Sequence, residues 1–454
     1  MSTEAEISSG SATPTVIEEP TLPRADAVDG LAHGAVTDAA ETTVIEIPRI
    51  ARALRHRDFR LFWTGNFLSN IGTWMQNIAQ GWLVLKLTNS AFWLGMVGFS
   101  SSFPILLFAL VGGVIADHVN KRKLLIVTQS AMMVFAFIMS ALAFFNVITV
   151  KEIVLLALGT GIAMSLNTPS YQALVPQLVP KEDLTNAIAI NSAQYNMSRV
   201  LGPTVGGFAM ALVHESGNFF LNGLSFLAVI VALSRIRYIE PPISRKGLWT
   251  PREGGIWEKM QQGFAYVFRD PAMSSLVVLV GIASLFAIPY LTFVPYFARD
   301  VLGSDEPGLG LLMACSGAGA LLGALTIASI ALIRRRGVFI MRAAIGFFVS
   351  IIFFTFSRNF YLSGFFLMIA GYCMIVSVAT INSSLQHLAE NSMRGRVMSI
   401  YSTAFLGLPP LGCLIAGLLT RVISTPHAIA GMTAVGLIGS LAVYYGREGL
   451  RELD

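Results

Sequence analysis

The chain has 454 residues, of which 54% are hydrophobic and only 13% are charged, and its mean hydropathy is +0.66. A soluble protein of this length would be about one quarter charged. The composition therefore excludes a soluble globular protein and indicates one that lies largely within a membrane. The net charge of +5 reflects the placement of basic loops beside the membrane, as the orientation below implies, and does not indicate binding to nucleic acid.

Residues 1–51 differ from the rest of the chain. The first 48 residues are acidic and rich in Ser, Thr, Ala and Pro, with Arg24 as their single basic residue. Such a composition buries no core, so we expect a disordered cytoplasmic tail that ends in a basic juxtamembrane segment. A regulatory role and an inert extension both remain open for it.

Twelve apolar segments follow, each near the length of about 20 residues that crosses a hydrocarbon core of about 30 Å. Since each segment must satisfy its own backbone hydrogen bonds in lipid, we predict an all-α membrane protein with twelve transmembrane helices. The predicted spans are 60–86, 91–116, 124–146, 152–175, 185–213, 218–237, 274–298, 307–333, 338–356, 360–386, 395–422 and 428–446.

Lysine and arginine set the orientation. Basic clusters precede the first span, follow the second at 121–123, fill the central loop and follow the eighth at 334–336, whereas the opposite loops hold few cations. Positive loops stay in the cytoplasm, so we predict that both termini are cytoplasmic.

The longest internal polar stretch, 238–272, separates an N-terminal six-helix half (52–237) from a C-terminal six-helix half (273–447), and 448–454 form a short tail. Within the loop, 256–270 has the spacing of an amphipathic helix that lies on the membrane surface. Two six-helix halves with a weak internal repeat are typical of a transporter whose substrate site lies between them.

The loop after the second span reads "GGVIADHVNKRK". It resembles the loop signature of the major facilitator superfamily. The resemblance implies the two-half fold of that superfamily and a conformational latch made by Gly113, Asp117, Lys121 and Arg122. A plain positive loop is the alternative. The corresponding loop of the C-terminal half keeps a basic cluster but lacks the acid.

The fifth predicted span contains "GPTVGG" at 202–207. It is similar to the Gly-Pro-x-x-Gly-Gly motif of exporters in this superfamily, carried here by Gly202, Pro203, Gly206 and Gly207. Proline bends a helix, and glycine lets a neighbouring backbone approach closely. We expect this helix to act as a hinge or a seal between the halves, with a purely structural kink as the alternative.

Three further stretches, "ALRHRDFRLFWTGNFLSNIGTWMQNIAQGWLVLKLTNS" (53–90), "PYFARDVLG" (295–303) and "RGRVMSIY" (394–401), resemble the branch that contains the enterobactin exporter and related siderophore or drug exporters. The resemblance implies a secondary active exporter in the bacterial inner membrane that moves a small molecule by alternating access, with proton antiport. An importer and a facilitated-diffusion carrier remain open. We predict a monomer that is not an enzyme. We expect no cofactor, no metal and no nucleic-acid partner.

Proton coupling is the least determined step, because the sequence places no Asp or Glu in the middle of a predicted span. The carboxylates that could carry a proton all lie near span ends: Asp58, Asp117, Glu152, Glu215, Asp300 and Glu390.

Arg199 lies midway along the fifth predicted span. A cation at that depth costs at least about 2.5–3.5 kcal/mol, so it should face the interior of the bundle. It either binds an anionic or acceptor-rich part of the substrate or bonds to acceptors of the protein.

Polar residues recur along one face of the first predicted span, at spacings of three and four residues. We expect this amide stripe to line a cavity, with hydrogen bonding between helices as the alternative. It consists of Asn66, Asn70, Thr73, Asn77 and Gln80. Other candidates for substrate binding are Tyr171, Gln172, Tyr195, Asn196, Tyr290, Asn382 and Gln386.

Overall fold

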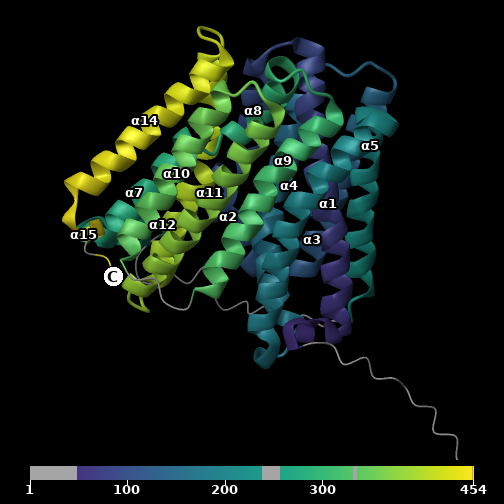
Figure 1. Cartoon of the computed structure of the whole chain (residues 1–454). Helices are drawn as coiled ribbons and strands as arrows, with labels where there is room; N and C mark the ends of the chain where they lie inside the picture. The colour runs from purple at the N-terminus through teal and green to yellow at the C-terminus, as the bar shows by residue number, and fades with distance from the viewer. Residues whose placement is uncertain (1–48, 238–255, 331–334, 452, 454) are drawn as a thin grey trace, which may run out of the picture. The chain divides into compact units, whose positions relative to one another are not determined.

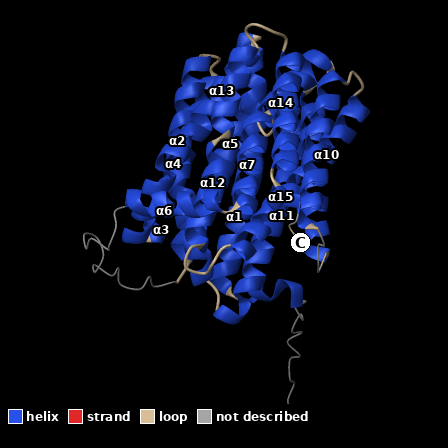
Figure 2. Cartoon of the chain, turned by 90° about the vertical axis from the view of Figure 1, so that its left-hand side faces the viewer, coloured by secondary structure: helices blue, strands red, loops and turns tan. Residues whose placement is uncertain are grey.

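The computed structural model describes residues 49–237, 256–330, 335–451 and 453. The predicted acidic tail and the first part of the predicted central loop therefore lie outside the described residues. Residues 47–454 form one compact unit, and the described part of it contains helices and no strands (Figures 1 and 2).

The N-terminal half begins with a short 3-10 helix, η1 (Arg49–Arg55), and continues with five long helices. Asn120 caps the third of them by accepting a hydrogen bond from the Lys123 N–H, as polar residues at helix starts commonly do. The long helices are α1 (Arg57–Thr88), α2 (Ala91–His118), α3 (Lys121–Phe144), α4 (Val150–Leu174) and α5 (Leu184–Arg235). Two 3-10 turns, η2 (Val175–Gln177) and η3 (Lys181–Asp183), join α4 to α5.

The C-terminal half is preceded by α6 (Ile256–Arg269), which confirms the helix predicted in the central loop. Asp270, Asp305 and Asn359 cap the helices that follow them. These helices are α7 (Pro271–Phe286), α8 (Tyr290–Tyr296), a π-helix η4 (Phe297–Val301), α9 (Glu306–Ser329), α10 (Arg336–Phe356), α11 (Phe360–Leu388), α12 (Arg394–Gly407), α13 (Pro409–Leu419), α14 (Thr425–Gly446) and α15 (Glu448–Arg451).

Ten helical segments of the described chain are long and apolar enough to cross a membrane. Helix α5 counts once among them, although one continuous helix of its 52 residues would be about 78 Å long at 1.5 Å per residue, more than twice a hydrocarbon core. It is interrupted at His214, where φ is 58°, between the predicted spans 185–213 and 218–237. Helix α1 does not count, because its amide stripe lowers its mean hydropathy. The number twelve thus remains a prediction.

Two predicted spans are not continuous helices. The span predicted at 274–298 divides into α7 and α8 around Pro289, and the span predicted at 395–422 divides into α12 and α13 at Leu408. Proline lacks the N–H that would continue the helical hydrogen bonds, and Pro409 begins α13.

The two halves meet along two helix pairs, α5 with α9 and α2 with α13. In Figure 1 the N-terminal half lies on the right and the C-terminal half on the left, with α2 and α9 between them. The largest hydrophobic cluster joins both halves near the end where α1 finishes and α9 begins, and it includes Ile78, Trp82, Leu94, Tyr290 and Leu309. We call this the closed end of the bundle.

Candidate functional site

The exporter-type motif of α5 forms the contact that closes this end. Gly207 faces α9, where a Cβ added to it would lie 2.9 Å from the Gly310 Cα. A Cβ on Gly310 would lie 2.6 Å from the carbonyl oxygen of Pro203. Both distances are shorter than any carbon side chain tolerates, so the backbones of α5 and α9 touch directly. Gly202 and Gly206 face α1 instead, against Trp74 and Met75.

Three polar or cationic contacts also join the halves at the closed end. The Trp82 indole N–H donates to a Glu306 carboxylate oxygen at 3.1 Å. An Arg299 guanidinium nitrogen donates to the Asn89 side-chain oxygen at 2.9 Å. The Arg421 guanidinium lies 3.6 Å from the centre of the Phe92 ring. Sequence analysis identified none of these contacts, because isolated polar residues at span ends form no recognisable spacing pattern.

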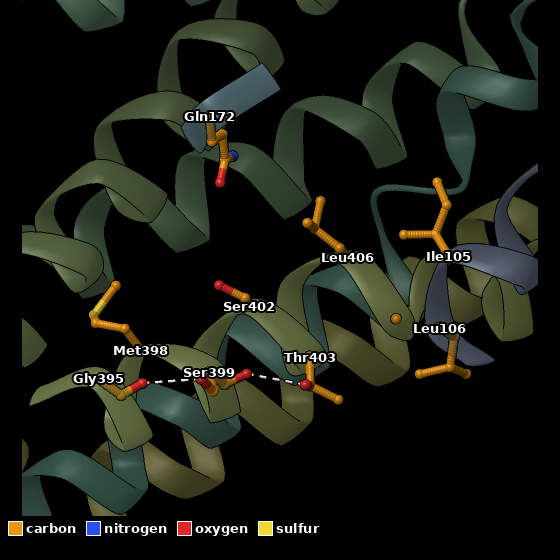
Figure 3. Close-up of a pocket in the computed structure, with 10 residues that line it drawn as sticks. Ile105, Leu106, Gln172, Gly395, Met398, Ser399, Ser402, Thr403 and Leu406 are labelled. Carbon is orange, nitrogen blue, oxygen red and sulfur yellow. Dashed lines mark hydrogen bonds between the residues drawn. The ribbon is translucent and has the colours of Figure 1, made fainter. Parts of the chain in front are cut away.

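At the other end a vestibule of about 350 Å³ separates the halves. Gln172 of α4 faces Ser402 and Met398 of α12 across it, and Leu106 of α2 lies at its edge beside the end of α12 (Figure 3). The hydroxyls of Ser399 and Thr403 donate to backbone carbonyls of their own helix, at 2.9 Å each. Gln172 is thus the predicted site residue that lines this vestibule.

A second cavity, of about 300 Å³, lies deeper and nearer the closed end. We call it the central cavity. The described residues that line it carry no charge, and the predicted site residues among them are Asn77 and Gln80. Thr292 and Cys413, which sequence analysis did not select, lie on the side of the cavity that the C-terminal half forms. The full lining is Trp74, Asn77, Ile78, Gln80, Gly81, Leu94, Val97, Gly98, Ser101, Ser102, Ile288, Leu291, Thr292, Pro295, Met313, Pro409 and Cys413.

Arg199 lies beside this cavity. It is only 8% exposed, and its guanidinium carbon lies 5.9 Å from the centre of the Trp74 ring, which lines the cavity. Its Nη2 atom is buried and has no hydrogen-bond partner within the described part of the chain. A charge taken out of water without a full set of acceptors is costly. Arg199 is not itself among the described residues that line the cavity, but its position suits an acceptor that the described part of the chain does not supply.

The amide stripe of α1 has an unexpected location. All five of its residues line a narrow cavity of about 80 Å³ inside the N-terminal half. Asn66 donates to the Tyr171 hydroxyl at 3.1 Å and to Gln194 at 3.4 Å, and the Tyr171 hydroxyl donates in turn to Asn191. Asn66 thus bonds α1 to neighbouring helices, whereas Thr73 donates to the Ser69 carbonyl of its own helix. Only the last two members of the stripe, Asn77 and Gln80, also line the central cavity. Gln76 and Asn222 also line the narrow cavity. The Asn222 amide donates to the Gln76 side-chain oxygen at 2.7 Å, and the three-four spacing of the stripe did not include either residue.

The other predicted residues lie apart from these cavities. Tyr290 is fully buried, with its hydroxyl 3.0 Å from the Ser316 hydroxyl. Tyr195 is 51% exposed, and Asn196 donates to a carbonyl of its own helix. Gln386 donates to Asn382 at 2.6 Å. These five do not line the vestibule, the central cavity or the narrow cavity.

The predicted latch is described only in part. The side-chain surroundings of residues 109–118, which include Gly113 and Asp117, are not described. Of the latch residues that are described, Arg122 donates to the Ser234 carbonyl at the end of α5, at 2.8 Å. Lys121 is also in contact with another group of the protein.

The chain is similar in sequence to curated bacterial transporters. It is 26% identical over 275 residues to the staphyloferrin A transporter of Staphylococcus aureus, which covers 59% of this chain and 66% of that protein. It is 24% identical over 383 residues to the enterobactin exporter EntS of Escherichia coli, which covers 84% of this chain and 90% of that protein.

Solved transporter structures share the fold. The nucleoside transporter NupG superposes with a TM-score of 0.67 at 12% identity, over 88% of this chain and 100% of that one. The D-xylose-proton symporter superposes with a TM-score of 0.64 at 14% identity, over 85% and 96%. A family model described as "transmembrane secretion effector" matches residues 51–453. The chain is therefore a member of the transmembrane secretion effector family, within the major facilitator superfamily of membrane transporters.

Proposed function

We propose that the chain exports a small molecule, of siderophore or drug-like type, by alternating access. The carrying observation is that two cavities lie between the halves, the vestibule at one end and the central cavity nearer the other, where the α5–α9 glycine contact brings the backbones together. The direction of transport rests on the Gly-Pro-x-x-Gly-Gly motif. The siderophore class rests on the names of the two curated relatives.

Arg199 is the substrate ligand that this proposal depends on most. A guanidinium presents several N–H donors in a planar fork that suits carboxylate and catecholate oxygens. Trp74, Asn77 and Gln80 would supply an aromatic face and amide groups beside it. We assign Asn66 and Tyr171 to holding α1 against α4, and Tyr290 to holding α8 against α9, since their polar groups bond within the protein.

Proton antiport is the energy source that we propose. Among the carboxylates near span ends, Glu215 is 7% exposed and pairs with Lys86 at 3.1 Å, so a movement of α5 that separates them would leave Glu215 without this ion-pair partner. A carrier that equilibrates its substrate without protons remains the alternative, as does an importer. The bacterial inner membrane is the proposed location, and Asp117 with its basic neighbours remains the proposed latch.

Flux measurements test the export proposal. The purified full chain is reconstituted into liposomes loaded with staphyloferrin A or enterobactin, and release is measured with an imposed pH gradient, with an imposed membrane potential, and with neither. An antiporter should release substrate faster when the pH gradient is present. Equal release under all three conditions would leave the facilitated carrier, and no flux of either compound would reject the siderophore assignment.

A deletion strain provides the test of direction. Loss of the gene should lower secretion of the native siderophore or raise sensitivity to a toxic compound, and the wild-type chain should restore both. Reduced uptake in the deletion strain, with secretion unchanged, would favour the importer instead.

Topology gives a separate prediction. Single cysteines at Ser244 and Ser304, in a chain without its three native cysteines, should react differently with an impermeant thiol reagent applied outside intact cells. Because basic loops stay in the cytoplasm, Ser304→Cys should react and Ser244→Cys should not. The reverse result would invert the orientation and place the vestibule on the outer side of the membrane.

A further inference from the structure

A fourth hollow lies outside the transport path, where α6, the start of α7 and the start of α12 meet. Its volume is about 710 Å³. Gly263 and Val267 of α6 pack against the protein, Gly263 beside the Arg396 side chain. The described residues that line the hollow are Gln262, Ala265, Tyr266, Arg269, Asp270, Pro271, Met273, Met393 and Arg396.

Two arginines give this hollow its charge. Arg396 donates to the Gln262 side-chain oxygen at 2.7 Å, and neither Arg396 nor Arg269 forms a salt bridge with a described carboxylate. Asp270 is the one carboxylate among the described lining residues. It accepts the N–H groups of Ala272 and Met273 at 2.8 and 2.9 Å, so its negative charge is engaged at the start of α7. The hollow is left with an excess of cationic donors.

The level of the hollow relative to the membrane follows from the spans beside it. A helical segment long and apolar enough to cross a membrane begins at Pro271, two residues after Arg269, and another begins at Arg394, two residues before Arg396. A membrane crossed by these segments would place both guanidiniums at the level of the lipid headgroups. Helix α6 lies at the lower left of the bundle in Figure 2.

Helix α6 also presents aromatic side chains. Phe264 and Phe268 are 42% and 51% exposed, and their rings stack with centroids 6.1 Å apart and an interplanar angle of 8°. Exposed apolar residues on one face of a helix with cations near its end are the arrangement of a helix at a membrane surface.

We propose that this hollow binds the phosphodiester headgroup of an anionic phospholipid. The Arg269 and Arg396 guanidiniums donate to the phosphate oxygens, as arginine does in phosphate recognition. The aromatic pair of α6 contacts the upper part of the acyl chains of the same lipid layer. A soluble phosphate would meet the same donors without the aromatic contact, so the two sources are separable by experiment.

Occupancy would also affect transport, because α12 borders both places. Arg396 faces the hollow, while Ser399 and Thr403 of the same helix line the vestibule. A lipid that holds α6 against α12 therefore stabilises the present position of a vestibule wall. This site does not depend on which substrate the vestibule takes or on the direction of transport.

Binding is measured on the purified full chain in detergent, by native mass spectrometry and by the melting temperature. Dioleoyl phosphatidylglycerol should bind and raise the melting temperature with increasing concentration, as any ligand of the native state does. Dioleoyl phosphatidylcholine and millimolar inorganic phosphate should raise it far less. An equal effect of inorganic phosphate would overturn the lipid assignment, and an equal effect of phosphatidylcholine would overturn the role of charge.

Substitutions identify the site. Each arginine near an anionic membrane surface contributes about fivefold in affinity, so Arg269→Gln together with Arg396→Gln should weaken phosphatidylglycerol binding roughly thirtyfold. Arg269→Gln alone breaks no hydrogen bond or ion pair with the described part of the chain, so it should lower affinity about fivefold with an unchanged melting temperature in the absence of lipid. Arg235→Gln together with Arg342→Gln, which removes two exposed arginines of α5 and α10, is the control and should bind normally. Wild-type affinity in the first double variant would reject the site.

Discussion

Replacing Arg199 with glutamine should abolish most transport without lowering the stability of the protein. The buried Nη2 of Arg199 has no acceptor in the described part of the chain, so the charge destabilises the substrate-free protein and its removal should leave the melting temperature equal or higher. A hydrogen bond to a charged group contributes about 1.5–3 kcal/mol, so substrate affinity should fall roughly 10- to 150-fold.

The measurement is substrate affinity beside the melting temperature, on the compound that the flux assay identifies. Arg199→Lys keeps the charge but loses the planar fork of donors, so it should transport more than Arg199→Gln and less than the wild type. Arg358→Gln, which removes an exposed cation, is the control and should transport normally. If Arg199→Gln instead melts at a much lower temperature and binds substrate normally, Arg199 serves the structure of the bundle and not the substrate.

The sequence was sufficient to predict the fold class, for a clear physical reason. A helix in lipid must satisfy its own backbone, and long apolar segments therefore leave few alternatives. The bounds of the first predicted span, 60–86, come close to those of α1, Arg57–Thr88. Prolines were less informative, because α2 and α5 continue through Pro104 and Pro203 whereas the chain breaks near Pro289 and Pro409. Neighbouring helices decide which proline interrupts a span, and the sequence does not contain that information directly.

Residues of the candidate site could be predicted where several of them recur at a regular spacing, or where one is unusual for its depth in a span. The spacing of the amide stripe correctly places its residues on one face of α1, yet it could not distinguish a cavity inside one half from a cavity between halves. A lone cation such as Arg199 was conspicuous because of its depth. The contact of Trp82 with Glu306, by contrast, joins residues 224 positions apart, and neither residue is unusual at the end of a span.

The glycine contact between α5 and α9 leads to the second large effect. Replacing Gly310 with valine should stop transport, because a Cβ there would lie 2.6 Å from the Pro203 carbonyl oxygen and a backbone atom does not move aside easily. Overpacking of this kind costs about 1–3 kcal/mol. The strain is present only while the halves touch, so the equilibrium should move roughly 5- to 150-fold toward the state in which this end is open.

Spin labels at Leu87 and Ser304, one on each half near the closed end, measure this change in a chain without native cysteines. The distance between the labels should grow in Gly310→Val and should grow less in Gly310→Ala, whose smaller side chain adds less strain. Gly431→Val on α14 is the matched control, since a Cβ at Gly431 meets no atom within 4 Å, and it should leave both distance and transport unchanged. Because each half keeps its own packing, Gly310→Val should still fold and reach the membrane. Normal transport with an unchanged label distance would show that the motif of α5 bends a helix but does not close the path between the halves.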